Sequence, residues 1–302
     1  MEARMQDRLE MLIALVREKH FGRAAEALGI TQPSLSFGIR ALEDQLGAPL
    51  VRRGSRYQGL TAEGERVYER ALRIVAETRA LRDDVRGVKG EVSGLIRLGV
   101  VPTALPLSAE LVAATRRKHP ALRFRILSRT AGEIADGLER LELEAGLSYT
   151  MGMEERSISV TPILTEHSCL LVHQDHELAA RESVDWSEVG DASPCLLTPG
   201  MTNRAIVEEH LRQAGVAPAP SVDSNSILAL TTLVALGDHA FVLPERLAHS
   251  VAVQAPVKRL SITDGKSATD DPQIGLLLPN RHRLPASLNA LRDAAGELRA
   301  RD

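Results

Sequence analysis

The segment 29–33, Gly-Ile-Thr-Gln-Pro, leaves the N-terminal part of this chain few ways to fold. Before it, apolar residues recur at helical spacing over 9–16 and again over 21–28. Thr31 can cap a new helix, and Pro33 falls in the first turn of that helix, where its missing N–H costs no hydrogen bond. The pattern predicts two short helices joined by a glycine-containing turn, which is the arrangement of a helix-turn-helix.

The second helix of this pair, expected over 32–46, has one apolar and one mixed face. A helical wheel places Leu35, Ile39, Leu42 and Leu46 on one buried stripe, which turns the opposite face outward. Arg and Gln can pair with base edges, Ser can reach phosphates, and Phe can contact a thymine methyl group. A solvated helix face is the alternative, but the outward Phe and the Thr-Gln-Pro start favour groove reading. The candidate DNA-contacting residues here are Thr31, Gln32, Pro33, Ser34, Ser36, Phe37 and Arg40.

An arginine-rich stretch follows at 49–57 and predicts a short hairpin, the wing of a winged helix-turn-helix. Arg52, Arg53 and Arg56 lie on it. Arginines on such a loop can contact phosphates or enter the minor groove, which positions the protein on DNA without strongly specifying sequence. Surface arginines are often only solvated, so this interpretation depends on the neighbouring helix.

A long helix is expected next, over 61–90, with Thr61 as its N-cap. Its apolar residues alternate spacings of four and three, as in the seam of a coiled coil. A second copy of the helix is the simplest partner and would give a two-fold dimer with two DNA-reading helices. A helix packed on its own core is the alternative. The seam positions are Val67, Ala71, Ile74, Thr78, Leu81, Val85 and Val88.

Residues 21–36, 39–43 and 60–64 together closely resemble the LysR-type transcriptional regulators. The resemblance is specific over the N-terminal part and extends over the rest of the chain as a layout. It implies a homodimer or homotetramer that binds double-stranded operator DNA and a small-molecule inducer, and that contacts RNA polymerase if it is an activator. It places Gln32, Pro33, Ser34, Ser36 and Arg40 on the recognition helix and the three arginines on the wing. The pair Phe37-Gly38 departs from the family's polar or basic residues at these positions.

Length and charge support a two-part protein. The 302 residues exceed one ordinary core and suggest two or three folding units. The net charge of −3 divides into +3 over residues 1–89 and −6 over 90–302, so only the N-terminal part suits a polyanion. No apolar run reaches the length of a membrane span, and the N-terminus lacks a signal peptide's apolar core, so we expect a cytoplasmic protein without membrane contact.

From residue 91 the pattern changes to alternating strands and helices, which predicts an α/β fold with a largely parallel sheet. The layout resembles the two-lobed, periplasmic-binding-protein-like effector domain of the LysR family. We therefore expect a winged helix-turn-helix over 1–60, a linker and dimerisation helix over 61–90, and an effector domain over 91–302. The first lobe would hold about 91–163 and 270–302, and the second about 164–269.

Such folds bind ligands at the carboxyl ends of strands, where helix N-termini present N–H groups to anions. Hydroxyls and an amide near helix starts suit a carboxylate or another small anion. The alternative is that Ser and Thr at these places only cap helices and loops. The candidate effector-binding residues are Pro102, Thr103, Ser128, Thr130, Thr202, Asn203 and Phe241.

Other classes of function have weaker support. His167, Cys169, His173 and His176 invite a zinc interpretation, but ligands spread along one flat strand reach too far, so we expect no metal and no other cofactor. Cys195 has a buried-strand context, and no phosphate loop, Gly-x-Ser-x-Gly or HExxH pattern occurs, so we expect no catalytic residues and no enzyme. A solute-binding transport protein would have no use for the N-terminal motif.

Overall fold

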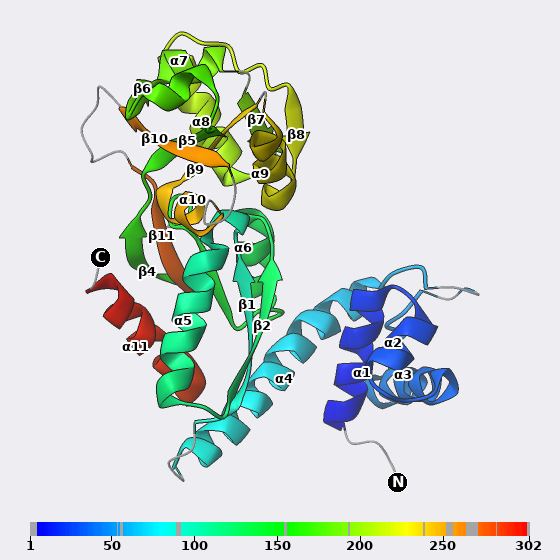
Figure 1. Cartoon of the computed structure of the whole chain (residues 1–302). Helices are drawn as coiled ribbons and strands as arrows, with labels where there is room; N and C mark the ends of the chain where they lie inside the picture. The colour runs from blue at the N-terminus through cyan, green and yellow to red at the C-terminus, as the bar shows by residue number, and fades with distance from the viewer. Residues whose placement is uncertain are drawn as a thin grey trace. The chain divides into compact units, whose positions relative to one another are not determined.

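The computed structural model describes residues 5–300 except 53, 55–56, 89–91, 154–155, 193, 238, 252–255, 264–270 and 282. For 79–80 and 82–88 it describes only the backbone. The chain forms two compact units that divide near residue 90 (Figure 1).

The first unit is helical, and its starts and stops follow local chemistry. Thr31 precedes α3 and its hydroxyl accepts a hydrogen bond from the backbone N–H of Ser34 at 3.3 Å, as the sequence predicts. Gly47 ends this helix in the left-handed region at φ 70°, which glycine adopts without strain. His20 caps the preceding helix through Nδ1, a cap that the sequence pattern did not reveal. The helices are α1 (Met5–Glu18), α2 (Phe21–Ala27), α3 (Gln32–Leu46) and α4 (Ala62–Val88).

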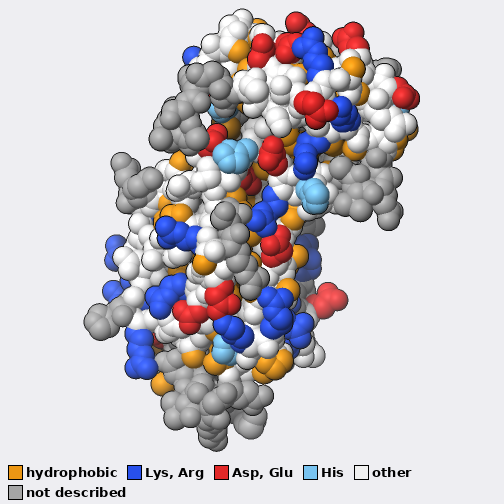
Figure 2. Space-filling model, turned by 60° about the vertical axis from the view of Figure 1, so that its left-hand side comes forward, with side chains coloured by type: hydrophobic (Ala, Val, Ile, Leu, Met, Phe, Trp, Pro, Cys, Tyr) orange, Lys and Arg blue, Asp and Glu red, His pale blue; other side chains and the backbone are white. Residues whose placement is uncertain are grey.

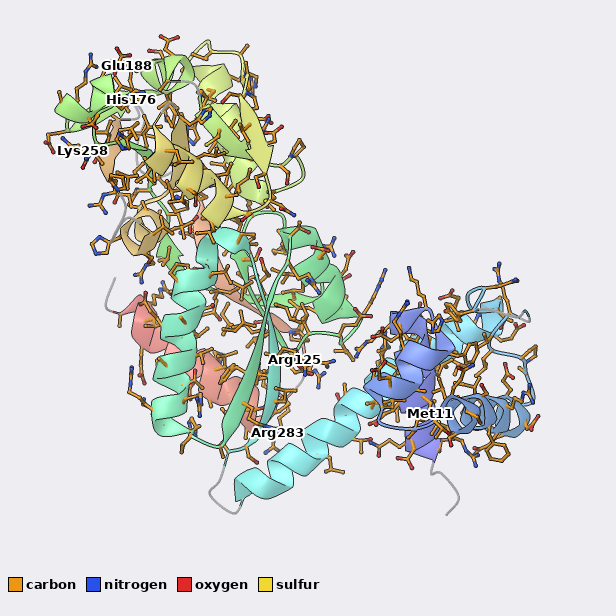
Figure 3. The ribbon with its side chains drawn as sticks, turned by 45° about the vertical axis from the view of Figure 1, so that its right-hand side comes forward. Met11, Arg125, His176, Glu188, Lys258 and Arg283 are labelled. Atoms are coloured by element: carbon orange, nitrogen blue, oxygen red, sulfur yellow. The ribbon has the colours of Figure 1, made fainter. Side chains whose placement is uncertain are left out.

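The buried stripe of α3 is shorter than its helical wheel predicts. Leu35, Ile39 and Leu42 are buried in the core of this unit, but Leu46 is exposed. That part of the prediction is wrong because the core of this unit does not extend to the last turn of α3. Gly38 instead completes the buried face: a Cβ there would lie 2.2 Å from Sδ of Met11 in α1, which Figure 3 labels. The glycine thus serves helix packing and leaves the outer face of α3 unchanged.

The long helix α4 uses its seam in two ways. Ala71 is fully buried and Val67 packs against the same core, together with Tyr68, Leu72 and Val75. Ile74 and Leu81 are exposed, and the side chains of Val85 and Val88 lie outside the described residues. The expected seam therefore begins as part of the unit's own core, and among its described side chains Ile74 and Leu81 are exposed.

Gly64, in the first turn of α4, lies against the backbone segment that leads into the wing. A Cβ built on it would come 2.0 Å from the backbone oxygen of Leu50, an atom that cannot move without shifting the wing. We expect Gly64→Ala to destabilise the first unit by about 3 kcal/mol. Hydrogen exchange of the α1–α3 amides in the full chain measures this loss. The control is Gly296→Ala, in a helix of the second unit with open space around it. It is expected to stabilise that helix by about 0.5–1 kcal/mol and to leave the protection of α1–α3 unchanged. Equal protection of α1–α3 in wild type and Gly64→Ala would contradict the assignment.

Lobe 1 of the second unit is a five-stranded sheet in the order β2-β1-β3-β11-β4. β1 pairs in parallel with β2 and β3, whereas β11 pairs antiparallel with β3 and β4, so the parallel prediction holds for three of the five strands. Helices α5 and α11 cover one face and α6 the other (Figure 1). The elements are β1 (Gly94–Val100), η1 (Pro102–Ala104), α5 (Leu105–Lys118), β2 (Leu122–Ser128), α6 (Ala131–Glu139), β3 (Ala145–Tyr149), β4 (Ile158–Thr165), β11 (Gln273–Pro279) and α11 (Ala286–Arg299).

Lobe 2 is a six-stranded sheet in the order β6-β10-β5-β9-β7-β8. Successive side chains along its strands point to opposite faces of the sheet. One set packs under α7 and α8, and the other under α9 and α10. The elements are β5 (Ser168–His173), η2 (Glu177–Ala180), β6 (Ser183–Asp185), α7 (Trp186–Asp191), β7 (Pro194–Leu197), α8 (Thr202–Gln213), β8 (Val222–Ser224), α9 (Ile227–Leu236), β9 (Ala240–Pro244), α10 (Glu245–Val251) and β10 (Val257–Thr263).

Candidate DNA-reading helix and inter-lobe site

The outer face of α3 carries the side chains that the sequence assigned to it. Thr31, Gln32, Pro33, Ser34 and Arg40 are exposed, and Ser36 is half-buried. Phe37 is 71% exposed, which is unusual for a large apolar side chain in a well-packed helix. The helix therefore presents an apolar ring beside a guanidinium, hydroxyls and an amide on one continuous surface.

Glu43 holds the wing at a fixed position on α3. Its Oε1 accepts hydrogen bonds from the backbone N–H groups of Leu50, at 2.7 Å, and Val51, at 3.1 Å. The wing is a short hairpin in which Val51 bridges Leu60. Arg52 is exposed, and its Nε donates to the backbone oxygen of Leu60 at 2.9 Å. The role of Glu43 was not predicted from the sequence. Its position beside the buried stripe of α3 is the signal that could have revealed it. Arg53 and Arg56 lie outside the described residues.

The second unit brings four polar side chains together where its lobes meet. Thr103 follows β1 and is almost fully buried, and its hydroxyl lies 3.1 Å from the hydroxyl of Tyr149 at the end of β3. The hydroxyl of Tyr149 also interacts with Glu166, between β4 and β5, and with Asn203, in the first turn of α8. This inter-lobe cluster of Thr103, Tyr149, Glu166 and Asn203 joins lobe 1 to lobe 2. Its formation depends on parallel strands whose carboxyl ends meet at one edge.

Glu166 is the electrostatically unusual member of the inter-lobe cluster. Burial raises its pKa to about 7, although the Tyr149 hydroxyl and the positive charge of Arg246 oppose the rise. Its Oε2 is buried and has no hydrogen-bond partner among the residues that the structure describes. Burial, followed by the charge of Glu166, also raises the pKa of Tyr149, so this phenol stays protonated and able to donate. Glu166 was not predicted from the sequence, where it is an isolated acid between two apolar strands.

The first turn of α8 faces this cluster without a side-chain cap. The helix begins at Thr202 after Met201, whose side chain offers no hydrogen bond to the first N–H groups. Arg204 is buried and fixes this turn: its Nη1 donates to the backbone oxygen of Leu197 at 2.8 Å and to Asp223 at 2.5 Å. An uncapped helix start carries partial positive charge and suits an anion.

The remaining predicted effector residues fall elsewhere. Pro102 is half-buried in η1 beside Thr103, and Ser128 is exposed at the end of β2. Thr130 caps α6 by accepting from the N–H of Glu133 at 3.3 Å, the role that the alternative interpretation gave it. Phe241 is buried under α9 and α10 because strand alternation turns it into the core of lobe 2, so we leave it out of the site.

The features that invited other interpretations have structural roles. His167 Nδ1 lies 2.9 Å from Oδ2 of Asp271, and Cys169 is buried in a strand. Over the described part of the chain, no three His, Cys, Asp or Glu side chains are placed to hold a metal ion. Likewise, none of the described helices has the length and apolarity to cross a bilayer. Figure 2 shows acidic and basic side chains interspersed over its visible face.

Comparison with known families accounts for both units. Residues 6–65 match the model of the bacterial regulatory helix-turn-helix protein, lysR family, and residues 89–300 match the LysR substrate binding domain. The chain belongs to the LysR family of transcriptional regulators. LysR regulators combine a DNA-binding domain with an effector-binding domain, and the fold described above has this combination.

Relatives and solved structures agree with this membership. A hydrogen peroxide-inducible genes activator of Pectobacterium carotovorum is 30% identical over 237 residues, 78% of each chain. A full-length OxyR variant of Pseudomonas aeruginosa has a TM-score of 0.75 at 25% identity and covers 98% of this chain and 95% of its own. Full-length CbnR in complex with its target DNA has a TM-score of 0.66 at 22% identity and covers 99% of this chain and 100% of its own. The latter similarity concerns the fold.

Proposed function

We propose that this LysR regulator reads its operator with the outer face of α3 and positions itself on DNA with the wing. The observation that carries the proposal is the exposure of Phe37 and Arg40 on a capped helix whose opposite face is buried. An α-helix fits into the major groove, and the residues exposed here can contact the base edges that the groove presents. The test is operator binding by variants of this face, measured against binding to non-specific DNA.

We further propose that a small anion, such as a carboxylate, is the effector and binds between Thr103 and the first turn of α8. The uncapped start of α8 supports an anion, and the hydroxyls of Thr103, Tyr149 and Thr202 supply neutral donors. An effector that contacts both lobes changes the equilibrium between lobe arrangements, and this shift is the basis of its coupling to DNA binding.

Thr202→Val is the direct test of the effector site. A thermal-shift screen of small carboxylates and inorganic anions first identifies a stabilising compound, because binding to the native state raises its melting temperature. The variant is expected to bind that compound about tenfold more weakly, because it loses one hydrogen bond to a charged group. Thr161→Val, the same change on β4, is the control. An unchanged shift in Thr202→Val removes this residue from the site.

We propose that the regulator is a homodimer or homotetramer. Ile74 and Leu81 expose the free part of the α4 seam. Helix α9 has no charged residue and leaves Leu228 76% and Leu236 78% exposed. A second copy of the chain is the partner that suits both surfaces, since identical apolar faces bury each other around a two-fold axis. We place the regulator in the cytoplasm, where bacterial DNA lies, with RNA polymerase as its further partner if it activates transcription.

The cysteines of this chain argue against peroxide sensing through a thiol, although curated relatives are peroxide-inducible activators. Cys169 and Cys195 are fully buried in strands of lobe 2. Burial raises the pKa of Cys169 to about 12 and that of Cys195 to about 11, so little of the reactive thiolate forms.

We expect hydrogen peroxide to leave operator affinity unchanged in the wild type and in Cys169→Ala and Cys195→Ala variants. Gel-shift titrations with and without peroxide, at fixed salt, check this result. A peroxide-dependent change in wild-type affinity that disappears in either variant would contradict it.

A further inference from the structure

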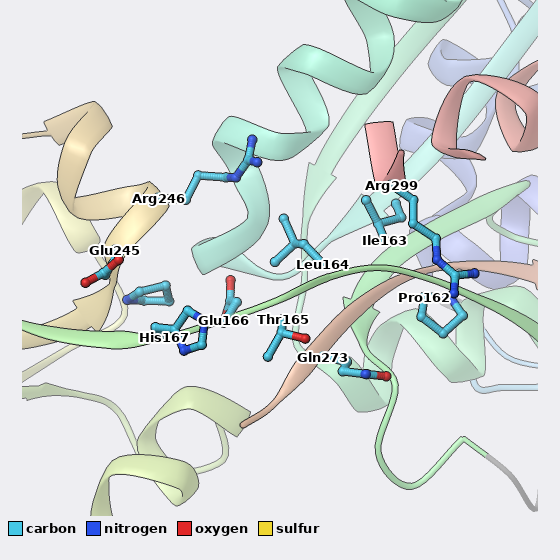
Figure 4. A pocket seen from close by; sticks show the side chains of 11 residues that line it. Pro162, Ile163, Leu164, Thr165, Glu166, His167, Glu245, Arg246, Gln273 and Arg299 are labelled. Carbon is cyan, nitrogen blue, oxygen red and sulfur yellow. The ribbon is translucent and has the colours of Figure 1, made fainter. Parts of the chain in front are cut away.

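The second unit has a pocket of about 600 Å³ that receives residues from both lobes (Figure 4). Lobe 1 contributes the end of β4, the start of β11 and Arg299 near the end of α11. Lobe 2 contributes the start of α10, including Glu245 and Arg246. Glu166, on the segment that connects β4 to β5, lines the pocket and also contacts Tyr149 of the inter-lobe cluster. The pocket thus meets the inter-lobe cluster at a single carboxyl group.

Part of the charge in this pocket is neutralised by neighbouring side chains. Arg246 Nη1 donates to both carboxylate oxygens of Glu110, at 2.7 and 2.9 Å. Nδ1 of His167 lies 2.9 Å from Oδ2 of Asp271. These groups have protein partners, so they do not define what the pocket recognises.

Three other side chains of the pocket offer polar groups to a ligand. Among the residues that the structure describes, the carboxylate of Glu245 and the guanidinium of Arg299 form no ion pair or side-chain hydrogen bond. The buried Oε2 of Glu166 likewise has no hydrogen-bond partner within that part of the chain. A carboxylate oxygen shielded from water is unfavourable without a donor, and a ligand group with N–H donors removes that cost.

The two carboxyl groups and the guanidinium lie toward opposite ends of the pocket. In Figure 4 Glu166 and Glu245 lie toward one end of the pocket and Arg299 toward the other, with Ile163 and Leu164 between them. A ligand that satisfies all three carries an ammonium group, an aliphatic middle and a carboxylate. We propose that this pocket is a second ligand site, which binds a small amphoteric molecule with its ammonium group against Glu166 and Glu245 and its carboxylate against Arg299.

Occupancy of this site has a mechanical consequence, since a ligand here contacts both lobes and stabilises one lobe arrangement over others. The residues that line this site do not include the proposed effector-binding residues Thr103 and Thr202 or the DNA-facing side of α3. The test therefore uses substitutions at Glu245 and Arg299, which are outside the inter-lobe cluster.

The experiment is isothermal titration calorimetry on the full chain. The probes are 4-aminobutanoate, 6-aminohexanoate and L-lysine, which vary the spacing between charges, with hexanoate and hexylamine as single-charge references. At least one amphoteric probe is expected to bind, and about tenfold more tightly than either reference, because each reference lacks one charge-assisted contact. Glu245→Gln and Arg299→Gln are each expected to weaken that probe about tenfold.

The controls are charge-matched. Glu177→Gln and Arg292→Gln remove an exposed charge from lobe 2 and from α11 outside the pocket, and both are expected to bind the probe as the wild type does. Thr202→Val is also expected to retain binding, which separates this site from the effector site. The proposal is overturned if no amphoteric probe gives saturable heat, if hexanoate or hexylamine binds equally well, or if neither pocket substitution weakens the probe.

Discussion

The Arg40→Ala regulator is expected to lose more than about thirtyfold of its operator affinity while it stays folded. A bidentate contact from arginine to a base edge is worth about 1–3 kcal/mol, and a dimer makes it twice. Arg40 is exposed on the same face of α3 as Phe37, and the core below that face does not depend on it. A fluorescence-anisotropy titration at fixed salt, on an operator selected from random duplexes, measures the loss.

Specificity separates base reading from general attraction to DNA. Arg40→Ala is expected to lose affinity for the operator but much less for a scrambled duplex, because its contact depends on the base. Arg52→Ala, on the wing, is expected to weaken both duplexes alike, because phosphates are the same in every sequence. It is also expected to reduce the slope of log affinity against log salt by about 1 for each phosphate that the variant no longer neutralises.

Arg116→Ala, an exposed arginine on α5 of the second unit, is the charge-matched control and is expected to bind as the wild type does. If Arg40→Ala binds the operator like Arg116→Ala, α3 does not read DNA through this face.

The Glu166→Gln regulator is expected to gain stability relative to the wild type as pH rises. Folding raises the pKa of Glu166 from 4.5 to about 7 because burial disfavours the charged form. Between these values the native state binds more protons than the unfolded chain, so wild-type stability falls as pH increases. From pH 5 to pH 8 this group alone removes about 2–3 kcal/mol, and the neutral amide of the variant avoids that loss.

Denaturant titrations at pH 5, 6, 7 and 8 measure this difference. Trp186, the only tryptophan of the chain, lies in lobe 2 and reports its unfolding by fluorescence. Glu177→Gln, which removes an exposed carboxylate from lobe 2, is the control and is expected to follow the wild-type curve. A stability difference between Glu166→Gln and wild type that is the same at all four pH values would show that Glu166 does not titrate as the buried cluster requires.

Helix α3 was the most predictable part of the protein because its signals are local. Thr31, the glycine turn before it and Gly47 define α3 through hydrogen bonds and backbone preferences that lie within a few residues. The alternation of strands and helices from residue 91 likewise predicted the α/β class of the second unit. Some elements give no clear local pattern: Pro162 interrupts β4, and an edge strand of the sheet tolerates it.

The candidate sites were predicted less well, for a physical reason that Glu166 and Phe241 illustrate. Sequence position placed Phe241 near the expected ligand, but the alternation of β9 turns its ring under α9 and α10. Nothing local distinguishes Glu166 from a surface acid. Its burial, its contact with Tyr149 and its open Oε2 arise from segments far apart in the chain.

The amino-acid sequence alone determined that this chain has a helix-turn-helix, a long helix and an α/β unit, since capping, periodicity and alternation act between near neighbours, whereas the two lobes were implied by the family resemblance. Only the tertiary structure decided which polar side chains meet between the lobes and which charges of the described residues there lack a protein partner. Both depend on the desolvation and pairing of residues from different elements. The linear order of residues does not directly encode the distances between those elements.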